Sequence, residues 1–231
     1  MSSTTDPEFD EYDESYQEVV ENAMKFSGMS HDYATRVKAK LIIDAALKRF
    51  DSLSGRSILD IGCGIGLTDA FLQDQPWRIS STDVSPKSIA QAQLRNPGVN
   101  YVVGTEDRLP FDDQEFDVCF TICVMHHVPP ENWTTFLGEM RRVLKPGGIA
   151  MVLEHNPVNP LTRLVVSRIP FDANAVLLGR RTLQRHMRQA GLAPAWSQYF
   201  LFSPWERLGG VDRLLGWLPL GAQYLVAAER E

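Results

Sequence analysis

The stretch Ser57-Ile58-Leu59-Asp60-Ile61-Gly62-Cys63-Gly64-Ile65-Gly66 decides the fold of this chain. Its first five residues are a short, mostly apolar run, which is typical of a buried strand in a parallel sheet. Three alternating glycines follow, and glycine permits positive φ angles and a close approach of a ligand to the main chain. The next residues, 67–72, can be helical, and N–H groups at a helix start favour an anionic or electron-rich ligand group. The stretch therefore predicts a nucleotide-type binding site.

The composition indicates one sizeable globular domain, with room for a small cap. The chain has 231 residues and a formal net charge of -6, which argues against a dedicated nucleic-acid binder. Its three cysteines are an odd number in apolar or glycine-rich surroundings, so we expect no disulfide framework. No apolar run is long enough to span a membrane and no signal peptide pattern begins the chain. We therefore expect a cytoplasmic protein without integral membrane contact.

The spacing of the glycines indicates which nucleotide binds. A dinucleotide fingerprint reads G-x-G-x-x-G, whereas Gly62, Gly64 and Gly66 alternate, with Asp60 two positions before the first. This pattern resembles motif I of the class I methyltransferases that depend on S-adenosylmethionine (SAM). The resemblance implies an α/β fold with a doubly wound, mostly parallel seven-stranded sheet, and SAM as the cofactor. It places Asp60, Gly62, Cys63, Gly64 and Gly66 at the methionine end of SAM.

Two further strands carry the other residues that the resemblance assigns to SAM. Residues 77–84 read as a second strand that ends in Asp83, where the family has the acid that accepts the ribose hydroxyls, and Val84 would pack on the adenine ring. Residues 100–104 read as a third strand. It opens into Thr105-Glu106, which resembles the family's adenine-binding stretch except that Thr105 stands where an acid is usual. We expect Thr105 and Glu106 to line the adenine pocket.

Histidines follow the fourth and fifth strands. Residues 116–123 read as the fourth strand, and the His-His-Val run after it resembles the UbiE-like branch, which acts mostly on small molecules. Ligands of open α/β sheets bind at the carboxyl ends of the strands, so Cys123, His126 and His127 should lie near the reacting methyl group. His155 follows the fifth strand. Each histidine is a candidate general base or a structural residue. Consecutive histidines rarely point at one ion, so we predict no metal site.

The flanks of the sheet predict a helical lid and a cap. A helix should begin after Ser30 and end near Phe50, within an N-terminal lid of residues 1–52 that closes over SAM. Tyr16, Phe26, Tyr33 and Arg36 are candidate lid contacts, with packing or a surface role as the alternative for each. Residues 53–231 form the methyltransferase domain, in which about 156–180 are a mainly helical cap insertion beside the acceptor. The amphipathic piece at 207–218 could cover the pocket, join a homodimer or, least favourably, touch a membrane surface.

These features predict a methyltransferase that moves a methyl group from SAM to an oxygen, or less favourably a nitrogen or carbon, of a small metabolite. A SAM-binding regulatory subunit without activity is the alternative, because acceptor residues define no motif. A nucleic-acid N-methyltransferase would usually carry an Asn/Asp-Pro-Pro-aromatic motif after the fourth strand, which Val128-Pro129-Pro130-Glu131 lacks. An NAD enzyme is disfavoured by the glycine spacing.

Overall fold

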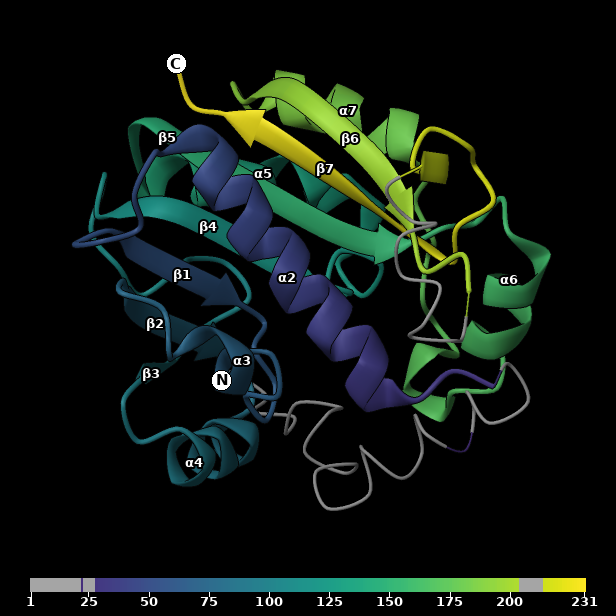
Figure 1. Ribbon diagram of the computed structural model, residues 1–231, viewed down its shortest axis with the longest axis horizontal. Helices are drawn as coiled ribbons and strands as arrows, with labels where there is room; N and C mark the ends of the chain where they lie inside the picture. The colour runs from purple at the N-terminus through teal and green to yellow at the C-terminus, as the bar shows by residue number, and fades with distance from the viewer. Residues whose placement is uncertain (1–21, 23–27, 204–213) are drawn as a thin grey trace, which may run out of the picture.

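The protein is built on one seven-stranded mixed sheet. The computed structural model describes residues 22, 28–203 and 214–231. The strands are β1 (Ser57–Ile61), β2 (Arg78–Asp83), β3 (Asn100–Val103), β4 (Phe116–Ile122), β5 (Leu144–His155), β6 (Ala193–Phe200) and β7 (Gln223–Glu229). Their order across the sheet is β3-β2-β1-β4-β5-β7-β6. The β1–β2, β1–β4, β2–β3 and β4–β5 pairs are parallel, whereas β7 is antiparallel to both of its neighbours, as the arrows of Figure 1 show. The predicted fold class is confirmed.

Helices cover both faces of the sheet because both faces are apolar. The helices are α2 (His31–Arg49), α3 (Asp69–Leu72), α4 (Pro86–Arg95), α5 (Trp133–Val143), α6 (Pro160–Val166) and α7 (Arg180–Gln189). Successive residues of a strand point to opposite faces, so Ile58 packs into one core with α2 and α4 while Leu59 packs into the other with α5 and α7. This covering on both faces is what a doubly wound sheet requires.

Helix α2 lies across the first of these faces (Figure 1). The Ser30 hydroxyl caps its start by accepting from the backbone N–H of Tyr33 at 3.2 Å, as the sequence predicts. Ile42, Ala45 and Ala46 are buried against the sheet. The helix is therefore part of the protein core. The division into a lid at 1–52 and a domain at 53–231 stays a prediction.

The run Lys145-Pro146-Gly147-Gly148 lies within β5, because the strand begins at Leu144, which pairs with Phe116. Gly147 adopts a φ of +74°, and its N–H bonds to the carbonyl of Arg230 at 2.7 Å, which keeps this run attached to the end of β7. Helix α7 begins at Arg180, directly after Gly179.

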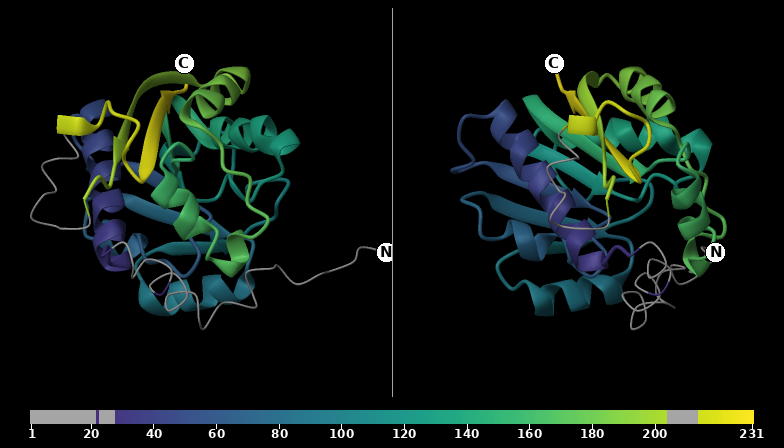
Figure 2. Two further views of the ribbon diagram at one scale, coloured as in Figure 1. Left: turned by 90° about the vertical axis from the view of Figure 1, so that its right-hand side faces the viewer. Right: turned by 45° about the vertical axis from the view of Figure 1, so that its right-hand side comes forward.

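A short cap segment stands at the end of the sheet toward which β4 and β5 point (Figures 1 and 2). It contains α6, capped by Asn159, and the 3-10 turn η4 (Pro170–Asp172). Asn156 ties its start to the C-terminal part of the chain, because its amide donates to the carbonyl of Gly221 at 2.8 Å. Most of the piece at 207–218 lies outside the described residues, as do residues 1–21 and 23–27 of the predicted lid.

No helix among the described residues is both long and apolar enough to cross a membrane.

Candidate active site

A cavity of about 830 Å³ opens at the carboxyl ends of the parallel strands. Its wall draws on β1, β2, β4 and β5, on the loop after β3, on the first half of α2, and on the cap segment. Of the residues that the sequence singled out, the following line it: Asp60, Gly62, Cys63, Gly64, Asp83, Val84, Thr105, Glu106, Cys123, His126, His127 and His155. Gly66 and Arg36 do not line it, and Tyr16 lies outside the described residues.

The glycine turn after β1 has one side toward the cavity and the other side toward the core. Gly64 has a φ of +52°, and a Cβ built there would meet nothing within 4 Å, so the main chain is open to a ligand at this point. Gly66 has a φ of +72°, and a Cβ there would come within 2.6 Å of side-chain atoms of Asn96 and Tyr101. Gly66 therefore serves the packing of the turn against its neighbours.

Asp83 holds the turn and the second strand together. One carboxylate oxygen accepts from the N–H of Gly64 at 2.8 Å and the other accepts from the N–H of Ser85 at 3.0 Å. Each oxygen of a carboxylate has a second lone pair that can accept from a ligand hydroxyl. Val84 follows directly at the cavity wall. Asp83 and Val84 together suit a ligand in which a diol lies next to a flat ring.

The loop after β3 forms the next part of the wall. Thr105 and Glu106 are both exposed and line the cavity. The Thr105 hydroxyl donates to the carbonyl of Arg108 at 3.1 Å, so it braces its own loop. Its oxygen retains lone-pair capacity for a donor such as an amino group.

Asp60 lies beneath the turn as one of two buried carboxyl groups. Burial, together with Asp69, raises the pKa of Asp60 far above its usual range. Burial also raises the pKa of Asp69, but this carboxylate accepts from Ser81 and Tyr101 at 2.8 Å each. Among the described residues, the Oδ1 atoms of both aspartates lack a hydrogen-bond partner that would donate to an anion. A proton that resides on Asp60 and is shared with Asp69 explains how two buried carboxyl groups can lie side by side.

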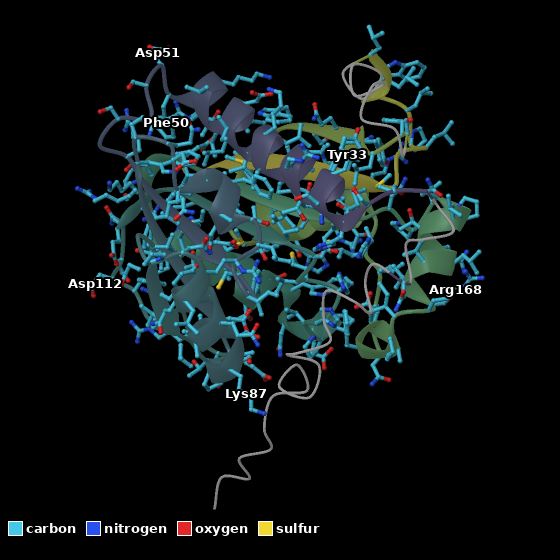
Figure 3. All side chains as sticks on the ribbon, turned by 60° about the horizontal axis from the view of Figure 1, so that its bottom comes forward. Tyr33, Phe50, Asp51, Lys87, Asp112 and Arg168 are labelled. Atoms are coloured by element: carbon cyan, nitrogen blue, oxygen red, sulfur yellow. The ribbon has the colours of Figure 1, made fainter. Side chains whose placement is uncertain are left out.

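Helix α2 presents a different face to the cavity than the sequence suggested. Arg36 pairs with Asp32 at 3.1 Å on the outside of the helix, and its side chain is 44% exposed. The residues of α2 that line the cavity are His31, Ala34, Thr35 and Lys38, which share one face by their spacing. Figure 3 shows Tyr33, at the start of α2, on the same side of the molecule as Arg168 of the cap segment. Phe50 and Asp51 lie at the opposite side.

His126 is the centre of a buried ion network. Its Nδ1 lies 2.7 Å from Glu154 Oε2, and its Nε2 lies 3.6 Å from Asp172 Oδ1. Burial lowers the pKa of His126, but the charges and hydrogen bonds of Glu154 and Asp172 outweigh it and raise the pKa to about 10. Glu154 also accepts from the N–H of Met125 at 2.8 Å. His126 is therefore an imidazolium at neutral pH, which cannot act as a general base.

His127 shares Asp172 with its neighbour. Its Nε2 lies 3.3 Å from Asp172 Oδ1, and its side chain is 21% exposed at the cavity wall. Burial raises the pKa of Asp172, yet its contacts with His126 and His127 bring the pKa below the usual range. Asp172 is therefore ionised and can stabilise positive charge on His127.

The same three residues have the spacing of a metal site. One atom each from His126, His127 and Asp172 lie within 4.8 Å of one another. In this structure the same three side chains contact one another, with Asp172 shared by the two imidazoles.

His155 and Cys123 both contact Gln223, the first residue of β7. The side-chain amide of Gln223 lies 3.3 Å from His155 Nδ1 and 3.4 Å from Cys123 Sγ. Burial, followed by the charge of His126, lowers the pKa of His155 to about 4. Burial raises the pKa of the Cys123 thiol to about 12. Both groups are neutral at pH 7.

Sequence reasoning missed Asp172 and Lys38. Asp172 follows Pro170 in a segment without a motif, and only the fold brings it to the histidines. Lys38 left a visible signal, because it stands between Ala34 and Ile42 at steps of four on the buried stripe of α2. A charge on a stripe that packs inward is a sign of function.

Comparisons with known proteins agree with this geometry. The methyltransferase domain family matches residues 59–152. An uncharacterized methyltransferase of Synechocystis is 36% identical over 106 residues, which are 46% of this chain and 50% of that protein. The 2-methyl-6-phytyl-1,4-hydroquinone methyltransferase of Synechocystis is 28% identical over 206 residues, covering 77% and 61% of the two chains. The chain thus spans about half the length of the first relative.

A solved structure agrees over nearly the whole chain. A SAM-dependent methyltransferase of Thermotoga maritima, described as a possible histamine N-methyltransferase, has a TM-score of 0.69 and 21% identity. The match covers 96% of this chain and 98% of that one. At this identity the likeness concerns the fold. Residues 59–152 therefore form a methyltransferase domain, and the chain has the fold of the SAM-dependent methyltransferases.

Proposed function

We propose that the protein is an enzyme that transfers the methyl group of SAM to an oxygen of a small metabolite. The observation that carries the proposal is the meeting, in one cavity, of an open glycine turn, Asp83 and a buried histidine cluster. The glycine turn and Asp83 supply the cofactor end, and the histidines supply the acceptor end. Transfer to nitrogen or carbon is less favoured because an oxygen acceptor makes the best use of a base.

The residues of the cavity fit SAM. The main chain at Gly64 is open to the methionine end, and Asp60 lines the cavity beneath the same turn. Asp83 would accept the ribose hydroxyls, Val84 would pack on the adenine, and Thr105 and Glu106 would border its amino group. When bound, SAM supplies a methyl group on a sulfonium, and transfer to the acceptor oxygen leaves a neutral thioether.

The chain's own part in the reaction is to align the acceptor, exclude water and remove a proton. Alignment alone can lower a barrier by roughly 7–11 kcal/mol. We assign proton removal to His127, which stands beside the ionised Asp172 at the cavity wall. His126 is already protonated, and His155 resists protonation because it is buried near His126. The hydroxyl proton would pass to His127 as the new O–CH₃ bond forms.

The first test is calorimetry with SAM and S-adenosylhomocysteine (SAH), followed by SAH release on a panel of hydroxylated, amino and carbon acceptors. We expect binding of both nucleosides, and turnover with a hydroxyl or phenol. His127→Ala should then lower kcat by about 10²–10⁴-fold without weakening SAH binding. Absence of SAM binding would overturn the proposal. Binding without turnover on any panel would favour the regulatory subunit instead.

The identity of the acceptor, the formation of a homodimer and the absence of a nucleic-acid substrate belong to the same proposal.

A further inference from the structure

Lys38 is a buried cation in the wall of the cavity. Its residue is 9% exposed, and within the described chain no hydrogen bond or ion pair joins its ammonium group to another residue. The other described lysines each have a partner. Lys40 pairs with Asp44, Lys145 pairs with Asp117, Lys48 lies over the ring of Trp196, and Lys87 has an interaction of its own. Although Lys38 is mostly buried, its Nζ atom remains accessible at the cavity wall, so its donors are available to a ligand.

The lysine lies on the acceptor side of the cavity. Its charge contributes to the lowering of the pKa of His155 and acts on the Cys123 thiol, and these residues follow β5 and β4. The pKa values of Asp60 and Cys63 at the glycine turn respond to burial and to neighbouring aspartates. His155 and Cys123 line the same cavity as Lys38, so its charge reaches the region that we assign to the acceptor.

The carboxylates next to the histidines are already paired. Glu154 is bonded to His126 and Met125, and Asp172 is shared by His126 and His127. Within the described residues, no ion pair joins Lys38 to the other carboxylates of the cavity wall, which are Asp60, Asp83, Glu106, Asp107 and Glu139. In the described part of the acceptor region, His126 is therefore paired with carboxylates and Lys38 is not.

We propose that Lys38 binds an anionic group, a carboxylate or a phosphate, carried by the methyl acceptor. This inference rests on the proposed function, since it places the acceptor at the histidine end of the cavity. The ammonium would fix one end of the acceptor by charge while its hydroxyl lies against His127. A lysine suits either anion, because it acts as a compact charge with three donors and does not demand a planar partner.

The test uses the full-length protein saturated with SAH and titrated with inorganic phosphate and, separately, malonate, followed by NMR chemical shifts. We expect saturable binding of at least one anion, weakened tenfold or more in Lys38→Met. Lys38→Arg should retain most of it. Lys40→Met is the matched control, because Lys40 lies on the same helix in an exposed pair with Asp44. It should bind like the wild type.

Folding is checked by the melting temperature, which Lys38→Met should leave unchanged or raise because a buried unpaired charge is removed. Lys38→Gln provides a second variant of similar volume. Equal anion binding in the wild type and both variants would overturn the inference. A tenfold loss of SAH affinity in Lys38→Met would overturn it too, since Lys38 would then hold the carboxylate of the cofactor. Failure of the wild type to bind SAH would instead refute the proposed function.

Discussion

Three histidines within one cavity differ in charge because their neighbours differ. His126 lies between two carboxylates and is protonated, whereas His155 has the amide of Gln223 and is neutral. The sequence predicted that all three stand at the ends of β4 and β5, because strand ends can be read from apolar runs. It left their roles open, because the carboxylates that set them lie 28 and 46 residues beyond His126. The sequence thus predicted the positions of the three histidines, and only the tertiary contacts assign their charges.

Asp172 is expected to act through His127. Asp172→Asn removes the charge that stabilises a protonated His127, so kcat should fall by about 10²-fold or more while SAH affinity changes less than twofold. The measurement is steady-state kinetics on an acceptor found by the panel. The double variant with His127→Ala should lose no more than His127→Ala alone. Additive losses would show that Asp172 serves the fold and not His127.

Asp60 should make the stability of the cofactor-free protein depend on pH. Its folded pKa is raised, so its contribution is fully present below the unfolded value of about 3.9 and is lost as pH rises toward the folded value. Asn mimics a protonated carboxyl, so Asp60→Asn should gain stability over the wild type as pH increases. Urea unfolding from pH 5 to 9 measures the difference. A difference that stays constant over this range would contradict a protonated Asp60.

Helix α2 belongs at once to the core and to the site. Its residues at steps of three and four form one stripe, and the stripe changes character along its length, from Lys38 at the cavity to Ile42 and Ala45 in the core. The sequence predicted the helix and its Ser30 cap. It could not show at which residue this stripe passes from the core to the cavity, because this depends on how far the helix extends past the sheet.

The core half of α2 should dominate its contribution to stability. Ile42 is fully buried, so Ile42→Ala should lower the free energy of unfolding by about 2–5 kcal/mol through lost transfer energy and a cavity. Leu47 on the same helix is 45% exposed, and Leu47→Ala should change it by less than about 1 kcal/mol. Urea denaturation of both variants tests this. Similar costs would mean that α2 is held by something other than this face.

At the scale of the whole molecule, the two ends of the parallel strands have different roles. The carboxyl edge carries the cavity, whereas the amino edge carries an ion cluster around Asp117. This carboxylate binds Arg56 at 2.9 Å, Lys145 at 2.8 Å and the N–H of Ser57 at 3.0 Å. The cluster joins the starts of β1, β4 and β5. The alternation of strands and helices in the sequence predicted this architecture, but no motif announced the cluster.

Asp117 should stabilise the fold without affecting the site. Burial raises its pKa, but Lys145, Ser57 and Arg56 lower it below the usual range, so its contribution is present above the unfolded value of about 3.9 and lost as pH falls. Asp117→Asn should lower the free energy of unfolding at pH 7 by about 1–2 kcal/mol, and by less toward pH 3. Asp83→Ala, in contrast, should act on the site and weaken SAH binding tenfold or more. A loss of SAH affinity in Asp117→Asn would contradict this separation.

The position of Asp172 in the cap segment limits how enzymes with other acceptors can be engineered from this one. Exchanging residues 157–178 for those of a relative would exchange the acceptor wall and, with it, one counter-ion of His126. The graft would leave His126 with Glu154 alone unless it carried a carboxylate at the same place. Chimeras that keep Asp172 should therefore fold, and those that omit it should need a compensating change at His126.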